Sequence, residues 1–171
     1  LRSDRASASG SARIAADAPF ALEAQVQATS IEGAPRPWQA SVKAAGPLAA
    51  IAVNAQLSSP QAVGAQLDAQ ATVSPFAAWP LSQLQASTRA LDLSALFTDA
   101  PQTQISGDAR IDTQGLDKPI TASVKLNNAQ PGRWDEKRLP VAELELDLLG
   151  RADQRDRLTL RRFELRAPGD G

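Results

Sequence analysis

Apolar and polar residues alternate over long stretches of this chain. From Val63 to Val73, every odd-numbered position holds Val, Ala or Leu, and the positions between them hold Gly, Gln, Asp or Thr. Because a strand turns successive side chains to opposite faces of its sheet, a period of two predicts strands with one dry and one wet face. The i, i+3, i+4, i+7 spacing of an amphipathic helix is not sustained anywhere. The sequence therefore predicts an all-β fold of long, mainly antiparallel strands.

The apolar residues are mostly small. The chain holds 33 alanines, Leu, Ile, Val and Phe together number 37, and aromatic residues make up only 4% of the sequence. Burying an alanine removes little apolar area from water, and the hydrophobic term follows that area. A long, thin core built by repetition is therefore favoured over a thick globular core.

Several classes of function are excluded by composition. A net charge of -1 lacks the basic surplus that a nucleic-acid-binding protein needs. Without His or Cys, the chain cannot form a Ser-His-Asp triad, a cysteine nucleophile or an ordinary zinc site. Glu143, Glu145 and Asp147 share one strand face, but their spacing is also that of an ordinary solvated face. We expect no enzyme activity, no cofactor and no metal.

The apolar positions of the alternating stretches form the candidate binding surface. They are Phe20, Leu22, Val26, Trp38, Val42, Ile51, Val53, Leu57, Val63, Leu67, Val73, Ile105, Ile111, Ile120, Val124, Leu126, Leu144, Leu146 and Leu148. A one-sided apolar sheet must be covered by a second sheet, by its own curvature or by a ligand. These residues therefore either pack a closed core or line a groove that is open to lipid chains.

One stretch interrupts the alternation. Residues 74–101 contain three prolines and a possible helical turn that begins after Asp92 as its N-cap, so we expect a crossing loop with a short helix between two strand blocks. The apolar phase shifts near Arg161 and Arg162, which predicts a β-bulge. Trp79 and Trp134 are expected to anchor loops.

The order of several motifs resembles a known family. The motifs are Ser74-Pro75-Phe76, Trp79-Pro80-Leu81, Leu91-Asp92-Leu93-Ser94, Ile105-Ser106-Gly107 and the closing stretch from Leu158-Thr159-Leu160 to Asp170-Gly171. Pro19, Pro37 and Pro119 each open a predicted strand. From Pro19 onward, the chain resembles the TamB family of the AsmA-like group in Gram-negative bacteria.

The resemblance implies a fold and a function. Proteins of this family are anchored in the inner membrane and cross the periplasm, and their repeats form a long curved β-taco sheet with an apolar concave face. The family is associated with an Omp85-type (TamA-like) outer-membrane partner, with outer-membrane protein assembly and with phospholipid transfer. Residues 1–171 would then be a single segment of a larger periplasmic β-repeat protein.

Three functions remain open at this point. The first is conduction of phospholipid acyl chains along the apolar groove. The second is a scaffold that pairs its sheet edges with nascent outer-membrane protein strands. The third is a structural β-sandwich or β-solenoid domain of a secreted or surface protein, in which the apolar face is closed and dry.

Overall fold

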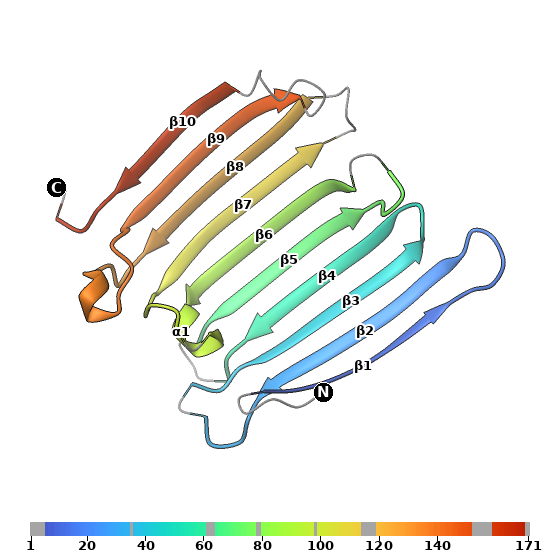
Figure 1. The fold of residues 1–171 in the computed structure, drawn as a ribbon, viewed down its shortest axis with the longest axis horizontal. Coiled ribbons are helices and arrows are strands. Elements are labelled where there is room, and N and C mark those ends of the chain that lie inside the picture. The colour runs from blue at the N-terminus through green and yellow to red at the C-terminus, as the bar shows by residue number, and fades with distance from the viewer. Residues whose placement is uncertain are drawn as a thin grey trace.

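The chain folds into one open antiparallel sheet of ten strands (Figure 1). The computed structural model describes residues 6–34, 36–60, 64–77, 80–97, 99–113, 119–151 and 159–169. The strands are β1 (Ala6–Ile14), β2 (Ala21–Ser30), β3 (Gln39–Pro47), β4 (Ile51–Ser58), β5 (Gln66–Val73), β6 (Leu81–Leu91), β7 (Ile105–Thr113), β8 (Pro119–Asn128), β9 (Glu143–Arg151) and β10 (Thr159–Arg166). The predicted all-β fold with antiparallel pairing is confirmed.

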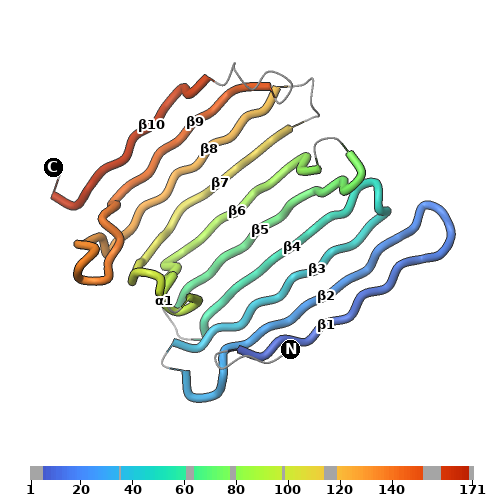
Figure 2. Tube along the Cα trace, in the orientation of Figure 1, coloured from blue at the N-terminus to red at the C-terminus, as the bar shows by residue number. Residues whose placement is uncertain are grey.

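Each strand pairs with the strand before it and the strand after it in the chain. Figure 2 follows this path as one trace, which leaves β1 and β10 at opposite edges of the sheet. The substantial contacts between elements likewise join sequential strands. The curved sheet is therefore built nearly one strand at a time, and each added strand extends the same two faces.

The predicted crossing loop at 74–101 interrupts the sheet over fewer residues than expected. The eleven-residue strand β6 lies inside this range and pairs with both β5 and β7, so the sheet continues through it. Only Leu84, Ala86 and the polar Thr88 mark its apolar phase, and this signal is too weak to stand out. The predicted short helix is present as α1 (Leu93–Leu96), and Asp92 caps it by accepting a hydrogen bond from the Ser94 backbone N–H.

Two further findings concern the outer strands of the sheet. Strand β1 was not expected, although Ala8, Gly10 and Ala12 alternate with serines there. Its residues are so small that the pattern carries little hydrophobicity. At the other end, the register of β10 against β9 shifts between Leu160 and Arg162, and the predicted bulge is confirmed.

The buried side chains lie at the two ends of the strands. Ile51, Thr113 and Ile120 are buried where β4 and β8 begin and β7 ends, and we call this the Ile51 end. Thr103 and Asn128 are buried at the opposite end, which we call the α1 end. The 3-10 helix η1 (Trp134–Glu136) also lies at the α1 end, where Asn128 Oδ1 accepts hydrogen bonds from the backbone N–H groups of Gln104 and Gln130.

Candidate functional site

Three continuous rows of small and apolar residues cross all ten strands on one face of the sheet. Residues directly opposed on neighbouring antiparallel strands point to the same face, so the register traces each row. We name the rows after their β4 members. The Ala55 row is Gly10, Val26, Val42, Ala55, Ala69, Ala86, Ala109, Val124, Leu146 and Phe163.

The other two rows flank the Ala55 row. The Val53 row is Ala12, Ala24, Ala44, Val53, Ala71, Leu84, Ile111, Ala122, Leu148 and Leu160. The Leu57 row is Ala8, Ala28, Ala40, Leu57, Leu67, Thr88, Gly107, Leu126, Leu144 and Leu165. At a strand spacing of about 4.8 Å, the rows extend roughly 43 Å across the sheet.

None of the residues in these three rows is buried. Val26, Val42 and Phe163 are 46%, 39% and 57% exposed, and most of the others are half-buried. The one polar side chain in the rows, that of Thr88, donates its hydroxyl to the backbone oxygen of Gln66 at 2.9 Å. The described residues thus supply neither a second layer over this face nor a free polar group within it.

Side-chain size varies across the apolar face. On β4 to β7 the Ala55 row consists of four alanines, whereas Val53, Leu84 and Ile111 flank it on one side. Leu57 and Leu67 flank it on the other side. The four alanines therefore form a low strip across the strands, which larger side chains border on both sides at β4 and β6 and on one side at β5 and β7, where Ala71 and Gly107 are the other neighbours.

The structure brings together most of the sequence-predicted site residues. Eleven of them belong to the three rows: Val26, Val42, Val53, Leu57, Leu67, Ile111, Val124, Leu126, Leu144, Leu146 and Leu148. Leu22, Ile51, Val73 and Ile120 lie at the Ile51 end, and Trp38 and Ile105 lie at the α1 end. Val63 and Trp79 lie outside the described residues.

Two aromatic residues differ from expectation. Phe20 precedes β2 with a φ of 55° and is 48% exposed, so its placement on a strand face is wrong. Trp134 is 66% exposed on η1, so it does not anchor its loop. Four further apolar members of the rows, Leu84 on β6 and Leu160, Phe163 and Leu165 on β10, were not among the predicted site residues, although the phase shift near Arg161 and Arg162 already indicated the apolar positions of β10.

The opposite face of the sheet is polar, and its charges concentrate on β7 to β10. Glu145 faces Lys125 with 2.7 Å between Oε1 and Nζ, and Arg162 with 3.0 Å between Oε2 and Nε. The hydrogen bond from Lys125 lowers the pKa of Glu145 and raises the pKa of Lys125. Arg166 likewise pairs with Glu143 at 2.9 Å. Glu143 and Glu145 of β9 therefore belong to cross-strand ion pairs.

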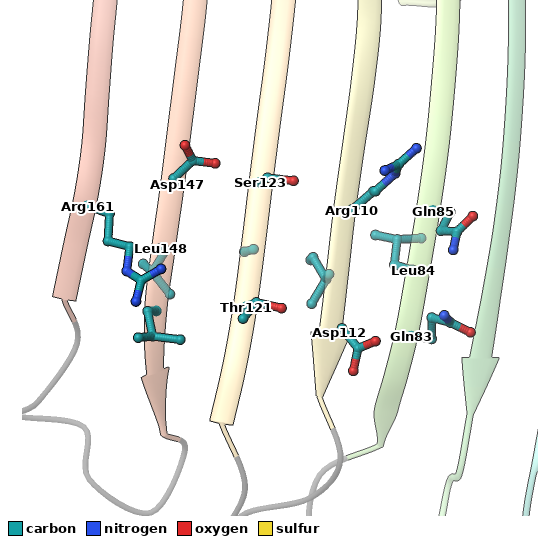
Figure 3. A pocket seen from close by; sticks show the side chains of 13 residues that line it. Gln83, Leu84, Gln85, Arg110, Asp112, Thr121, Ser123, Asp147, Leu148 and Arg161 are labelled. Carbon is teal, nitrogen blue, oxygen red and sulfur yellow. The ribbon is translucent and has the colours of Figure 1, made fainter.

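A shallow depression of about 470 Å³ lies on this polar face. Figure 3 shows the short side chains of Thr121 and Ser123 on β8, with Arg110 and Asp112 on one side and Asp147 and Arg161 on the other. The depression follows from the difference in side-chain length between β8 and its neighbours. Two guanidinium groups and two carboxylates balance in charge, so this surface selects neither anions nor cations.

A second cavity, of about 210 Å³, lies at the α1 end of the apolar face. Trp38, Leu57, Leu91 and Leu96 line it together with Arg36 and Asp92. Because Leu57 also belongs to one of the three rows, this cavity is continuous with the apolar face.

The comparisons with known proteins give no relatives. No family model, no curated protein and no solved structure matches this chain. Within the described ranges, no group of three or more carboxylates is placed to hold a metal ion. Neither described helix has the length and apolar character needed to cross a membrane.

Proposed function

We propose that the apolar face binds phospholipid acyl chains and lets them move across the strands. The observation that carries this proposal is that three apolar rows cross ten strands without one buried residue. Monomeric soluble proteins rarely expose a continuous apolar surface of this extent, and such surfaces mark contacts with apolar partners. Each methylene group of a lipid that leaves water on this face contributes about 0.8 kcal/mol.

The chemistry of the rows suits a conduit better than a selective receptor. Methyl and methylene groups offer dispersion contacts without direction, and the only hydroxyl in the rows is occupied by the Gln66 backbone. An acyl chain lying on the low alanine strip would meet four successive alanines from β4 to β7. With no strongly preferred position, it can pass from strand to strand at low cost.

In this proposal the chain is a periplasmic segment of a TamB-like protein. The support is the order of motifs given by the sequence together with the open one-sided sheet. A parent protein with an inner-membrane anchor and a TamA-like outer-membrane partner would join such segments end to end. The apolar rows would then serve outer-membrane biogenesis by carrying phospholipid between the membranes.

The test places charges on the apolar face and compares them with the same charges on the polar face. The variant Val42→Asp/Val53→Asp/Val124→Asp puts carboxylates on β3, β4 and β8 within the rows. Its matched control, Ser41→Asp/Asn54→Asp/Ser123→Asp, changes the neighbouring residue of each strand, which faces the other side. We expect bound phospholipid in native mass spectra of the wild type and the control, and its loss in the first variant.

Circular dichroism keeps the comparison interpretable, because both triple variants must retain the β spectrum. A wild type that carries no phospholipid and takes up none from added vesicles would contradict the proposal. Sedimentation velocity then identifies the remaining possibility, which is a face-to-face dimer that closes the apolar face and favours a structural role.

A further inference from the structure

The cavity at the α1 end combines an apolar lining with a single guanidinium group. Trp38, which directly precedes β3, lines it together with Leu57 of β4 and Leu96 of α1. Arg36 lies at the same cavity and is 48% exposed. Cavities of this kind, mostly apolar with a few convergent polar groups, are the usual form of small-molecule sites.

Arg36 is held in place from one side only. Its Nη1 group donates to Asp92 Oδ2 and, at 2.7 Å, to the hydroxyl of Ser94. Within the part of the chain that the structure describes, its Nε and Nη2 groups have no hydrogen-bond partner. The guanidinium therefore keeps free donors that can bind an anionic oxygen in the forked geometry typical of arginine.

Asp92 is held by several donors, so its carboxylate does not depend on Arg36 alone. Besides Arg36, Asp92 accepts hydrogen bonds at Oδ1 from the backbone N–H and the hydroxyl of Ser94, at 3.0 and 2.8 Å. The backbone N–H of Thr103 donates to the same oxygen at 3.3 Å. The other polar residues that line the cavity, such as Gln104 and Gln130, are neutral.

We propose that Arg36 binds the phosphate of a phospholipid whose acyl chains enter the apolar face past Trp38 and Leu57. The α1 end of the sheet would then be the place where head groups are recognised, while the three rows accommodate the chains. This inference rests on the proposed function, since it names the residue that selects the lipid head group at the same apolar face.

The experiment measures affinity with Trp38 as the only tryptophan, in the variant Trp79→Phe/Trp134→Phe. The probes are dihexanoyl phosphatidylglycerol, dihexanoylglycerol, which has the same chains without phosphate, and laurate as a carboxylate. We expect the phospholipid to bind at least about tenfold more tightly than dihexanoylglycerol, as one well-formed charged contact provides. Arg36→Gln should remove this preference and Arg36→Lys should restore part of it.

A second substitution distinguishes head-group binding by Arg36 from a purely structural role of its ion pair with Asp92. Asp92→Asn removes the ion pair but keeps Arg36 and leaves a good N-cap for α1. If Arg36 binds phosphate, Asp92→Asn preserves or strengthens the preference for the phospholipid. If Arg36→Gln and Asp92→Asn lose the preference for the phospholipid equally, the inference is overturned and the ion pair has a purely structural role.

The remaining outcomes are also decisive. Equal binding of phospholipid and dihexanoylglycerol to the wild type overturns the role of Arg36 while the proposed function stands. Laurate that binds as tightly as the phospholipid, and depends on Arg36, overturns the assignment to phosphate in favour of a carboxylate. If none of the probes binds the wild type, the proposed function fails together with the inference.

Discussion

The two faces of the sheet are built from the same strands and yet differ in how uniform they are. On the apolar face, the Ala55, Val53 and Leu57 rows stay small or apolar from β1 to β10, with Thr88 as the only polar side chain. The polar face changes along the sheet. Over β2 to β6 it holds mainly Ser, Gln, Asn and Thr, whereas ion pairs join β8, β9 and β10.

This difference indicates that the two faces have separate roles. Incomplete burial limits what the apolar rows add to stability, because half-exposed side chains realise only part of the hydrophobic term. The backbone ladder and the polar face must hold the strands in register. The apolar face is then free to keep one surface chemistry along the whole sheet, as the proposed conduit requires.

The largest effect is expected where the backbone ladder itself is crowded. Gly107 on β7 has a φ of 149°, and an added Cβ would lie 2.9 Å from Leu126 Cα and meet the backbone oxygen of Lys125. Gly107→Ala should lower the free energy of unfolding by about 4 kcal/mol, through backbone strain and the displacement of β8. Urea denaturation followed by circular dichroism measures this change.

Gly10→Ala is the matched control, because Gly10 belongs to the central Ala55 row but lies on the outer strand β1. Its added Cβ would approach the Gln25 backbone oxygen at 2.7 Å, and an outer strand can move away from this contact. We expect a smaller loss. Equal losses would show that the interior of the sheet relaxes as easily as its edge.

The next effect compares two positions on the apolar face. Ile120 on β8 is 8% exposed at the Ile51 end, whereas Val26 in the Ala55 row is 46% exposed. Ile120→Ala should cost about 2–3 kcal/mol, and Val26→Ala well under about 1 kcal/mol, because only the first leaves a cavity. The same urea titrations test this. Similar costs for both would mean that the central rows are packed in solution, contrary to an open face.

The alternation of residues was sufficient to predict the architecture and most of the apolar face. It assigned Val42, Val53 and Val124 to one surface because β-branched residues at a period of two leave little choice of face. It failed for β1 and β6, where Ala, Gly and Thr replace larger residues and weaken the pattern. Ala86 of β6 belongs to the low strip, so the shape of the surface required the register.

The α1 end could not be predicted for a different reason. Arg36 and Asp92 are 56 residues apart in the sequence, and β4 and β5 lie between β3, which follows Arg36, and β6, which precedes Asp92. No periodicity links such positions. The N-cap role of Asp92 was readable because capping is local, whereas its ion pair depends on where two loops meet.

The smallest effect concerns the ion pairs of the polar face and depends on pH. Lys125 lowers the pKa of Glu145, so the ionised carboxylate is favoured in the folded state. Its contribution to stability is present above the ordinary glutamate pKa and is lost as the pH falls through the lowered folded value. Glu145→Gln should therefore destabilise the chain at neutral pH, and the difference from the wild type should vanish in acid.

Glu23→Gln provides the matched control, because Glu23 lies on the polar face of β2 and has no ion pair within the described residues. Urea titrations of both variants at neutral and acidic pH, each at low and high salt, separate the cases. Salt screens exposed pairs, so the effect of Glu145→Gln should also shrink at high ionic strength. If Glu23→Gln loses as much stability with the same pH dependence, the charges of β8 to β10 act only through the net charge of the chain, and the contrast along the polar face has no energetic meaning.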